Sequence, residues 1–512
     1  LRRLTAWAHT AGAAFIGVNP LHAMGNRDGA VSPYSPVSRL YDNPIYLDVT
    51  AIPEWTESDA ARAIADSAEL RHALADVRER TRVDYDAVWT LKARVLTVLH
   101  RAFVQQHRDR ATPRGAAYAA FLEREGTALD AFAAYCALDE TFGDHSAPPD
   151  WRRWPAEYHD PHGPAVTRFV HDRSELVDRH RWFQFEVRRQ LGAAAAPLDA
   201  RLGLYTDIAV GAAPGGSDAW TWGPLFADGA TIGAPPDAYA MEGQDWALPP
   251  IHPHRLREDR YAYWIRLLRA SLAHAGTIRL DHVMGLFRLF WIPRGRPAAD
   301  GAYVRYPAED LLGILALEST RHRAVVIGED LGTVPAEVPD AMRRYGLLAS
   351  RVLYFQRDEH GEFLPPAAYP ADALATVATH DHVPFAGYWS GADLPLRRAI
   401  DASVETPEDR ARDRAALTRR LTADGGLTAE HVDTPDVLRS AHAVLARTPC
   451  ALVAAALDDL GGETEPVNVP GVGPGRYPSW TRKMTRGLEE ITTAPETERA
   501  LAPFASRRVE GS

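Results

Sequence analysis

The sequence reads Thr277-Ile278-Arg279-Leu280-Asp281-His282 at a point where an apolar, β-branched run ends in a carboxylate. Two later segments, residues 325–331 and 376–382, repeat this arrangement and contain Glu329 and Asp381. Apolar runs of this length indicate strands that are buried on both faces. A carboxylate just past the end of such a strand is typical of parallel-sheet enzymes, which keep their chemistry at the C-terminal edge of the sheet.

The three carboxylates Asp281, Glu329 and Asp381 lie too far apart in the sequence to share one strand. A helix N-cap or an ion pair in a loop would explain any one of them alone. The neighbouring residues His282 and Asp330 are second candidates for the catalytic roles, because alternation along a strand points their side chains away from those of Asp281 and Glu329. Taken together, the three predict a glycoside-cleaving site with a nucleophile, an acid/base and a group that holds the sugar and its cationic transition state.

The residues around these carboxylates suggest how the roles are divided. Arg279 precedes Asp281 by two residues, so both side chains point to the same side of the strand. A fixed guanidinium there is expected to lower the pKa of Asp281, which suits a nucleophile that must stay ionised. Glu329 follows a buried strand near two other carboxylates, and these are expected to raise its pKa, as an acid/base requires. Asp381, with His380 as a neighbouring donor, is then expected to hold sugar hydroxyls.

Seven segments are predicted as strands from their apolar and β-branched residues. They cover residues 15–18, 202–210, 277–283, 324–328, 351–355, 374–378 and 451–457. Helical patterns, such as the one at residues 260–273, lie between them, and this alternation is typical of a parallel α/β sheet. An eighth strand ahead of the first residue would close a (β/α)₈ barrel. We therefore expect an α/β fold, a TIM barrel with helical insertions that apparently lacks its first strand.

The chain is expected to have three parts. Residues 1–52 would form the start of the barrel, residues 53–200 a mainly helical insertion, and residues 201–512 the rest of the barrel with inserted loops and extra helices. Apolar residues at three- and four-residue steps support the helical insertion. Pro148, Pro149 and Pro164 are expected to interrupt it, and a further helix is expected to begin near Arg181.

Composition excludes several classes of function. The net charge is −11 and the basic residues are scattered, which makes nucleic acid an unsuitable partner. The two cysteines, Cys136 and Cys450, exclude a disulfide scaffold and are interpreted as buried thiols. The sequence has no Cys or His cluster with metal-ligand spacing and no Gly-rich phosphate loop, so we expect no cofactor.

No membrane association is expected from the sequence. It contains no run of the ~20 apolar residues that a membrane span needs. The basic start at Arg2 and Arg3 is followed by Trp7, His9 and Thr10, which argues against a signal peptide. A cytoplasmic location is therefore the default expectation.

From about residue 12 to about residue 490, the sequence resembles the amylomaltases, also called 4-alpha-glucanotransferases or disproportionating enzymes, which are relatives of the alpha-amylases. Besides the three carboxylate segments, the resemblance rests on six motifs. They are residues 17–23 (GVNPLHA), 32–36 (SPYSP), 203–211 (GLYTDIAVG), 233–237 (GAPPD), 243–246 (GQDW) and 465–471 (EPVNVPG).

The resemblance implies a reaction and a substrate. It implies retaining transfer of alpha-1,4-glucan segments between malto-oligosaccharides and alpha-glucans, with Asp281 as the nucleophile. It also implies that residues 15–18 correspond to the second barrel strand, which favours a sequence truncated at its N-terminus. The oligomeric state is not predicted.

The resemblance further implies a set of binding residues. Tyr34 is similar to a ring-stacking tyrosine next to the cleaved bond, and Gln244 with Trp246 is similar to a loop that covers the acceptor side. Asp207 and Asn468 match positions near the bound glucan. Core packing is the alternative for each aromatic residue. The segment 382–385 (HVPF) departs from the family pattern of Leu-Pro followed by a polar residue, which concerns the lining beyond Asp381.

Two other functions share these features. An alpha-glucan hydrolase of the amylase type would use the same carboxylates, and only the resemblance of residues 244–246 and 468–471 favours transfer. An inactive, truncated glucan-binding fragment is the second alternative, because the first strand is absent. The intact set of three carboxylates argues against it.

Overall fold

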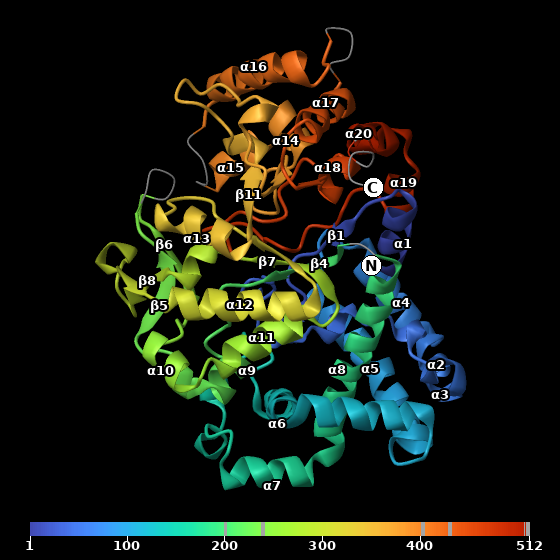
Figure 1. Cartoon of the computed structure of the whole chain (residues 1–512). Helices are drawn as coiled ribbons and strands as arrows, with labels where there is room; N and C mark the ends of the chain where they lie inside the picture. Colours follow the sequence, from blue (N-terminus) through green and yellow to red (C-terminus); the bar gives the residue numbers. More distant parts are fainter. Residues whose placement is uncertain (199–201, 237–240, 401–404, 429–432, 506, 508–512) are drawn as a thin grey trace. The chain divides into compact units, whose positions relative to one another are not determined.

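The computed structural model of the protein describes residues 1–198, 202–236, 241–400, 405–428, 433–505 and 507 (Figure 1). The chain divides into two compact units, and each is described by itself. Unit 1 comprises Leu1–Thr5, Ala14–Asp281 and Gly285–Ala324. Unit 2 comprises Ala6–Ala13, His282–Met284 and Val325–Ser512.

Unit 1 contains three parallel strands that carry part of the predicted site. Strands β1 (Phe15–Gly17), β4 (Gly203–Ile208) and β7 (Ala275–Leu280) pair in this order. Helices α11 (Ala262–Leu272) and α12 (Ala308–His322) lie side by side in Figure 1, and α11 packs against β7. Helix α11 thus packs against the strand that follows it, as in a βαβ arrangement.

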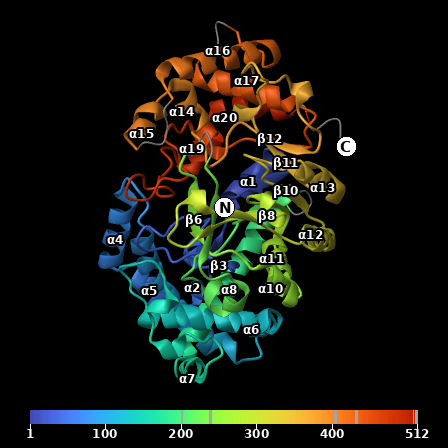
Figure 2. The same ribbon diagram turned by 90° about the vertical axis from the view of Figure 1, so that its left-hand side faces the viewer.

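Unit 1 also contains a long helical segment between β3 (Ser38–Asp42) and β4. Its helices are α2 (Glu54–Glu57), α3 (Asp59–Ala65), α4 (Ala68–Glu79), α5 (Tyr85–Phe103), α6 (Pro113–Phe142), α7 (Pro164–Asp172) and α8 (Ser174–Ala195). Helices α6 and α8 lie side by side in Figure 2. Phe103, Tyr118 and Phe185 meet in edge and tilted ring contacts, which give this segment an aromatic core.

Two expectations for this segment were wrong. Pro164 does not interrupt a helix but begins α7, where the missing proline N–H costs nothing because the first N–H groups of a helix have no partner within it. Helix α8 begins at Ser174 rather than near Arg181. The boundaries expected at residues 52 and 200 stay a prediction.

A four-stranded antiparallel sheet in unit 1 was not predicted from the sequence. Its strands run in the order β6 (Gln244–Leu248), β5 (Ala230–Ala234), β8 (Arg288–Pro293) and β9 (Ala302–Arg305). Residues 244–246, which were expected in a loop, therefore lie on edge strand β6. These strands are short and mix polar with apolar residues, so they lack the continuous apolar runs that mark strands buried on both faces.

Unit 2 contains four further parallel strands. They are β10 (Val325–Gly328), β11 (Leu348–Val352), β12 (Ala373–Thr376) and β13 (Leu452–Ala454), paired in this order from β10 to β13. With the three strands of unit 1, each of the seven predicted segments overlaps a strand, but the segment 351–355 does so only at its first two residues, because β11 ends at Val352 and a 3₁₀ helix (Leu353–Phe355) follows. The extra helices expected before the last strand include α15 (Asp393–Ala399), α16 (Pro407–Asp424) and α17 (Thr434–Ala446), and α16 and α17 are neighbours in Figure 2.

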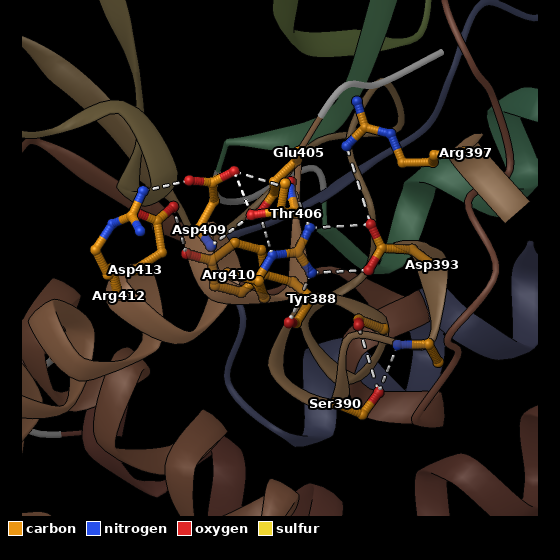
Figure 3. A network of polar contacts seen from close by, with 12 residues as sticks. Tyr388, Ser390, Asp393, Arg397, Glu405, Thr406, Asp409, Arg410, Arg412 and Asp413 are labelled. Carbon is orange, nitrogen blue, oxygen red and sulfur yellow. Dashed lines mark hydrogen bonds and ion pairs between the residues drawn. The ribbon is translucent and has the colours of Figure 1, made fainter. Parts of the chain in front are cut away.

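A buried ion-pair network in unit 2 connects helix α16 to helix α15 (Figure 3). Arg410 of α16 pairs with Asp393 of α15 at 2.8 Å and with Glu405 at 2.6 Å. Its guanidinium also donates to the Tyr388 carbonyl oxygen at 2.9 Å and lies 4.5 Å from the centre of the Tyr388 ring. Because Arg410 is buried, these partners must satisfy its charge and its donors within the fold.

Candidate active site

Unit 1 holds one group of the predicted site residues at the ends of β4 and β7. Arg279 on β7 lies 3.1 Å from Asp281, which directly follows the strand, and the same guanidinium nitrogen lies 2.6 Å from Asp207 on β4. The pairing of β4 with β7 places Asp207 opposite Arg279. One buried cation therefore serves two carboxylates, and the two-residue spacing puts Arg279 and Asp281 on the same side of the strand.

Tyr34 completes this group from the loop before β3. Its hydroxyl donates to Asp207 Oδ2 at 2.6 Å. Burial and the negative charge of Asp207 raise the pKa of Tyr34 well above its usual value, so the phenol remains a donor. Tyr34, Asp207, Arg279 and Asp281 form one connected set, which we call the Arg279 cluster.

Arg279 is the charged centre of the Arg279 cluster. Burial opposes the charge of Arg279, but Asp207 and Asp281 outweigh it and hold the pKa of Arg279 well above its usual value. A cation that cannot lose its proton is a permanent electrostatic partner for Asp281. The arrangement can therefore present an oriented carboxylate at the end of β7.

Gln244 and Trp246 lie on β6 of the antiparallel sheet. The Trp246 indole N–H donates to Gln244 Oε1 at 3.1 Å. The Trp246 side chain packs against an apolar cluster formed by Ile232, Leu248 and Leu289. Trp246 thus takes part in core packing, the alternative that the sequence left open for each aromatic residue.

In unit 2, Glu329 directly follows β10 and is held by backbone donors. The His282 N–H donates to Glu329 Oε2 at 3.0 Å, and the Leu331 N–H donates to Oε1 at 2.6 Å. His282 has a φ of 48°, which is uncommon for a residue with a side chain and is needed here to aim its N–H. His282 therefore contributes its backbone to this site, a contribution that no sequence pattern indicated.

Asp330, the neighbour of Glu329, has a different environment. It is buried and accepts from Arg351 at 2.9 and 3.0 Å and from the Ser350 N–H at 2.8 Å. Both partners belong to β11, so Asp330 ties β10 to the next strand. This structural engagement supports ranking Glu329 above Asp330 for the chemistry.

Asp381 lies in a turn after β12, beside an amide and an imidazole. Asn468 Nδ2 donates to Asp381 Oδ1 at 2.7 Å, and His380 Nε2 lies 3.3 Å from Oδ2. The ring of His380 lies 5.5 Å from that of Trp480. We call Asp381, His380 and Asn468 the Asp381 group. Its carboxylate side chain is 36% exposed, so it can still bind other hydroxyl groups.

The segment that departs from the family pattern is mostly core. Val383 and Phe385 are buried in the apolar core of unit 2. The Phe385 N–H donates to Asp459 Oδ1 at 2.7 Å, and burial raises the pKa of Asp459 to about 7. Only His382 of this segment remains beside the Asp381 group with part of its surface open.

Sequence reasoning missed a second support of the Asp381 turn. Thr379 Oγ1 accepts from the Asp381 N–H at 3.3 Å. A threonine two residues ahead of a turn residue is a recognised turn signal and would have identified it. Asp237, quoted in one family motif, lies outside the described residues.

Among the described residues, no three or more His, Cys, Asp or Glu side chains gather in a way that would hold a metal ion. None of the helices in the described ranges combines the length and the apolar character that crossing a membrane requires. Cys136 and Cys450 are both free thiols.

Comparison with known proteins gives consistent results. The model of one protein family, described as 4-alpha-glucanotransferase, matches residues 1–489. The 4-alpha-glucanotransferase of Mycobacterium tuberculosis is 40% identical over 509 residues, which cover 95% of this chain and 68% of the relative. That of Haemophilus influenzae is 33% identical over 503 residues, which cover 94% of this chain and 71% of the relative.

Two solved structures are similar in fold. The amylomaltase of Corynebacterium glutamicum has a TM-score of 0.84 and 32% identity, over 98% of this chain and 71% of its own. The amylomaltase of Streptococcus agalactiae in complex with acarbose has a TM-score of 0.77 at 17% identity, over 99% of this chain and 94% of its own. This likeness confirms the predicted fold class, a parallel (β/α)₈-barrel type of fold.

Proposed function

The chain belongs to the 4-alpha-glucanotransferase family, and from this premise we propose how its residues carry out the transfer. Its activity is that of a 4-alpha-glucanotransferase, a transferase that acts on alpha-glucans. The match of the family model over residues 1–489 is the observation that carries this conclusion. The residue roles below are the proposal.

Asp281 is proposed as the nucleophile. It attacks the anomeric carbon of the donor glucan and forms a covalent glycosyl-enzyme, while the leaving sugar departs. Arg279, at 3.1 Å, keeps the Asp281 carboxylate oriented, and its second carboxylate partner Asp207 fixes the guanidinium in turn. A 4-hydroxyl of an acceptor sugar then attacks the anomeric carbon from the face that the leaving sugar vacated and displaces Asp281, and the two inversions together retain the configuration.

Glu329 is proposed as the acid/base. It protonates the departing glycosidic oxygen in the first step and takes the proton of the acceptor hydroxyl in the second. The backbone donors of His282 and Leu331 fix the orientation of its carboxyl group. A carboxyl group with a fixed orientation can deliver its proton to the glycosidic oxygen and recover one from the acceptor hydroxyl.

Asp381 is proposed to hold sugar hydroxyls and to stabilise the oxocarbenium-like transition state. Asn468 donates a hydrogen bond to its carboxylate and, being an uncharged amide, does not neutralise it. Tyr34, Gln244 and Trp246 are proposed to contact the sugars on either side of the cleaved bond. Malto-oligosaccharides are the proposed donors and acceptors, and a cytoplasmic location stays part of the proposal.

Product analysis with maltotriose in the presence of a chelator tests this proposal. Transfer predicts a ladder of shorter and longer glucans with little gain in reducing ends. Asp281→Ala, prepared in the same way, is the control for contaminating enzymes. Hydrolysis alone would favour the amylase-type alternative, and a requirement for added metal would contradict the proposed mechanism.

A further inference from the structure

The ring of His382 lies on the open side of the turn that carries Asp381. It meets the ring of Phe355 edge to face, with centroids 4.9 Å apart and planes at 66°. Phe355 follows β11 and is 49% exposed, which is uncommon for so large an apolar side chain. His382 is only partly buried, so its ring borders solvent on the side of Phe355.

The hydrogen bonds of His382 determine which ring nitrogen carries the proton. Thr379 Oγ1 lies 2.7 Å from His382 Nδ1, and the Thr379 backbone N–H donates to the same nitrogen at 3.3 Å. A backbone N–H can only donate, so Nδ1 accepts and the proton of the neutral ring is on Nε2. The Thr379 contacts thus leave Nε2–H as the donor of this side chain.

The surroundings of His382 keep the ring neutral. Burial lowers the pKa of His382 to about 4; Asp381 opposes this shift, and His380 and Arg397 add to it. At neutral pH the ring is therefore an uncharged donor and places no cation beside Asp381. A neutral donor suits the binding of a sugar hydroxyl, which is itself uncharged.

The Nε2 atom of His382 has no hydrogen-bond partner within the described parts of the chain. If this atom were buried, it would be an unsatisfied polar atom, and it is not one of those. Nε2 is therefore open to solvent. Thr379 fixes the ring through Nδ1, and the Nε2–H on the other side of the ring is available to a hydrogen-bond acceptor outside the protein. Its sequence neighbour Asp381 identifies the sugar chain as that partner.

We propose that His382 is a further substrate-binding residue, whose Nε2–H donates to a hydroxyl of the glucose unit held by Asp381. The proposal rests on the proposed role of Asp381. It adds a neutral hydrogen-bond donor, the His382 ring, to the carboxylate that holds the sugar. The carboxylate accepts from one hydroxyl and the imidazole donates to another. Together they would select a sugar with both hydroxyls in place.

A purely structural role is the alternative, in which His382 only supports the turn through Thr379. The two roles use different nitrogens of the ring, which allows a matched pair of variants. In His382→Asn the amide can occupy the place of Nδ1 and keep the Thr379 contact, but nothing reaches the place of Nε2. In His382→Gln the amide N–H can reach the place of Nε2, but the Thr379 contact is lost.

The test measures kcat and KM for transfer with maltotriose, together with Tm, for the full chain and both variants. Substrate binding predicts that His382→Asn lowers kcat/KM about 3- to 10-fold, mostly through KM, with Tm unchanged, as expected for one neutral hydrogen bond. His382→Gln should stay within about 2-fold of the parent protein. The reverse order, equal losses in both variants, or parent-like activity of both would overturn the proposal.

Asp381→Asn, measured beside them, separates this proposal from the function on which it rests. If Asp381→Asn loses activity by orders of magnitude while His382→Asn behaves like the parent, only the role of His382 fails. If Asp381→Asn itself remains active, the assignment of Asp381 fails, and the donor proposed beside it fails with that assignment.

Discussion

The Arg279 cluster in unit 1 and the Asp381 group in unit 2 hold their carboxylates in opposite ways. Asp281 and Asp207 share one buried guanidinium at 3.1 and 2.6 Å, whereas Asp381 is held by an amide at 2.7 Å and an imidazole at 3.3 Å. The Asp281 side chain is 20% exposed and that of Asp381 is 36% exposed. A permanent cation suits a nucleophile that must stay ionised, and the greater exposure of Asp381 suits a carboxylate that must still bind sugar hydroxyls.

Removal of the reacting carboxyl groups should have the largest effect. Asp281→Ala and Glu329→Gln should each lower kcat by at least ~10²-fold while the fold is kept, because each removes a covalent or proton-transfer step. Transfer kinetics with maltotriose, whose departing sugar needs a proton, measure this, with circular dichroism as the folding control. Azide should partly rescue Asp281→Gly and give a product of inverted configuration. Near-parental activity of either variant would place the chemistry elsewhere.

Removal of Arg279 from the Arg279 cluster should lower stability more than removal of the Asn468 side chain from the Asp381 group. Arg279→Met leaves Asp207 buried without a cation and should lower the free energy of unfolding by about 3–5 kcal/mol. Asn468→Ala removes one hydrogen bond from a partly exposed carboxylate and should cost only about 1 kcal/mol. Urea unfolding of both variants makes the comparison, and similar losses would show that the cluster is not the more tightly coupled of the two.

A buried carboxyl group near the Asp381 turn provides a test by pH. Burial raises the pKa of Asp459 from 3.8 to about 7, so between these values the folded protein holds a proton that the unfolded chain has released. Stability should therefore fall as pH rises from about 4 to about 7. Asp459→Asn keeps an oxygen for the Phe385 N–H and should raise the free energy of unfolding at pH 8 by up to about 4 kcal/mol.

The neighbouring residue Asp458 is the matched control for that variant. Asp458 lies 2.5 Å from the Arg482 guanidinium, so its charge is paired where that of Asp459 is not. Asp458→Asn should leave stability at pH 8 unchanged or lower it. Unfolding of both variants at pH 5 and pH 8 distinguishes them, and an unchanged pH dependence in Asp459→Asn would contradict the interpretation.

The smallest effect is expected at Trp246, outside both groups. If the exposed part of its ring contacts the acceptor sugar, Trp246→Ala should weaken acceptor binding by roughly 1 kcal/mol and raise the ratio of hydrolysis to transfer. Its packing against Ile232, Leu248 and Leu289 predicts some loss of Tm as well. Measurement of Tm, hydrolysis and transfer on one preparation separates the two roles. A lower Tm with an unchanged ratio would leave Trp246 a purely structural residue.

The sequence predicted the parts of the fold whose signals are local. The parallel strands were visible because their segments are rich in apolar and β-branched residues, as in residues 325–327. The proximity of Arg279 and Asp281 followed from the two-residue period of a strand. The antiparallel strands β5, β6, β8 and β9 were missed because their pairing is non-local and their residues are mixed.

Other features of the candidate site have no local signal. Asn468 reaches Asp381 across 87 residues of sequence, and only the family resemblance pointed to it. The His282 N–H that binds Glu329 belongs to a residue with a positive φ, and the sequence at that position did not indicate this backbone conformation. Pro164 was misinterpreted because a proline interrupts a helix in its interior but is tolerated at its first turn. Only the folded backbone makes such contacts visible.

Trapping the glycosyl-enzyme tests the central claim most directly, the assignment of Asp281 as the nucleophile. The protein would be incubated with 5-fluoro-alpha-D-glucosyl fluoride, whose glycosyl-enzyme turns over slowly, then digested and analysed by mass spectrometry. We predict a single hexosyl adduct on Asp281, lost when a malto-oligosaccharide acceptor is added before digestion. An adduct on Glu329 or Asp381, or a transfer product of inverted configuration, would contradict the account.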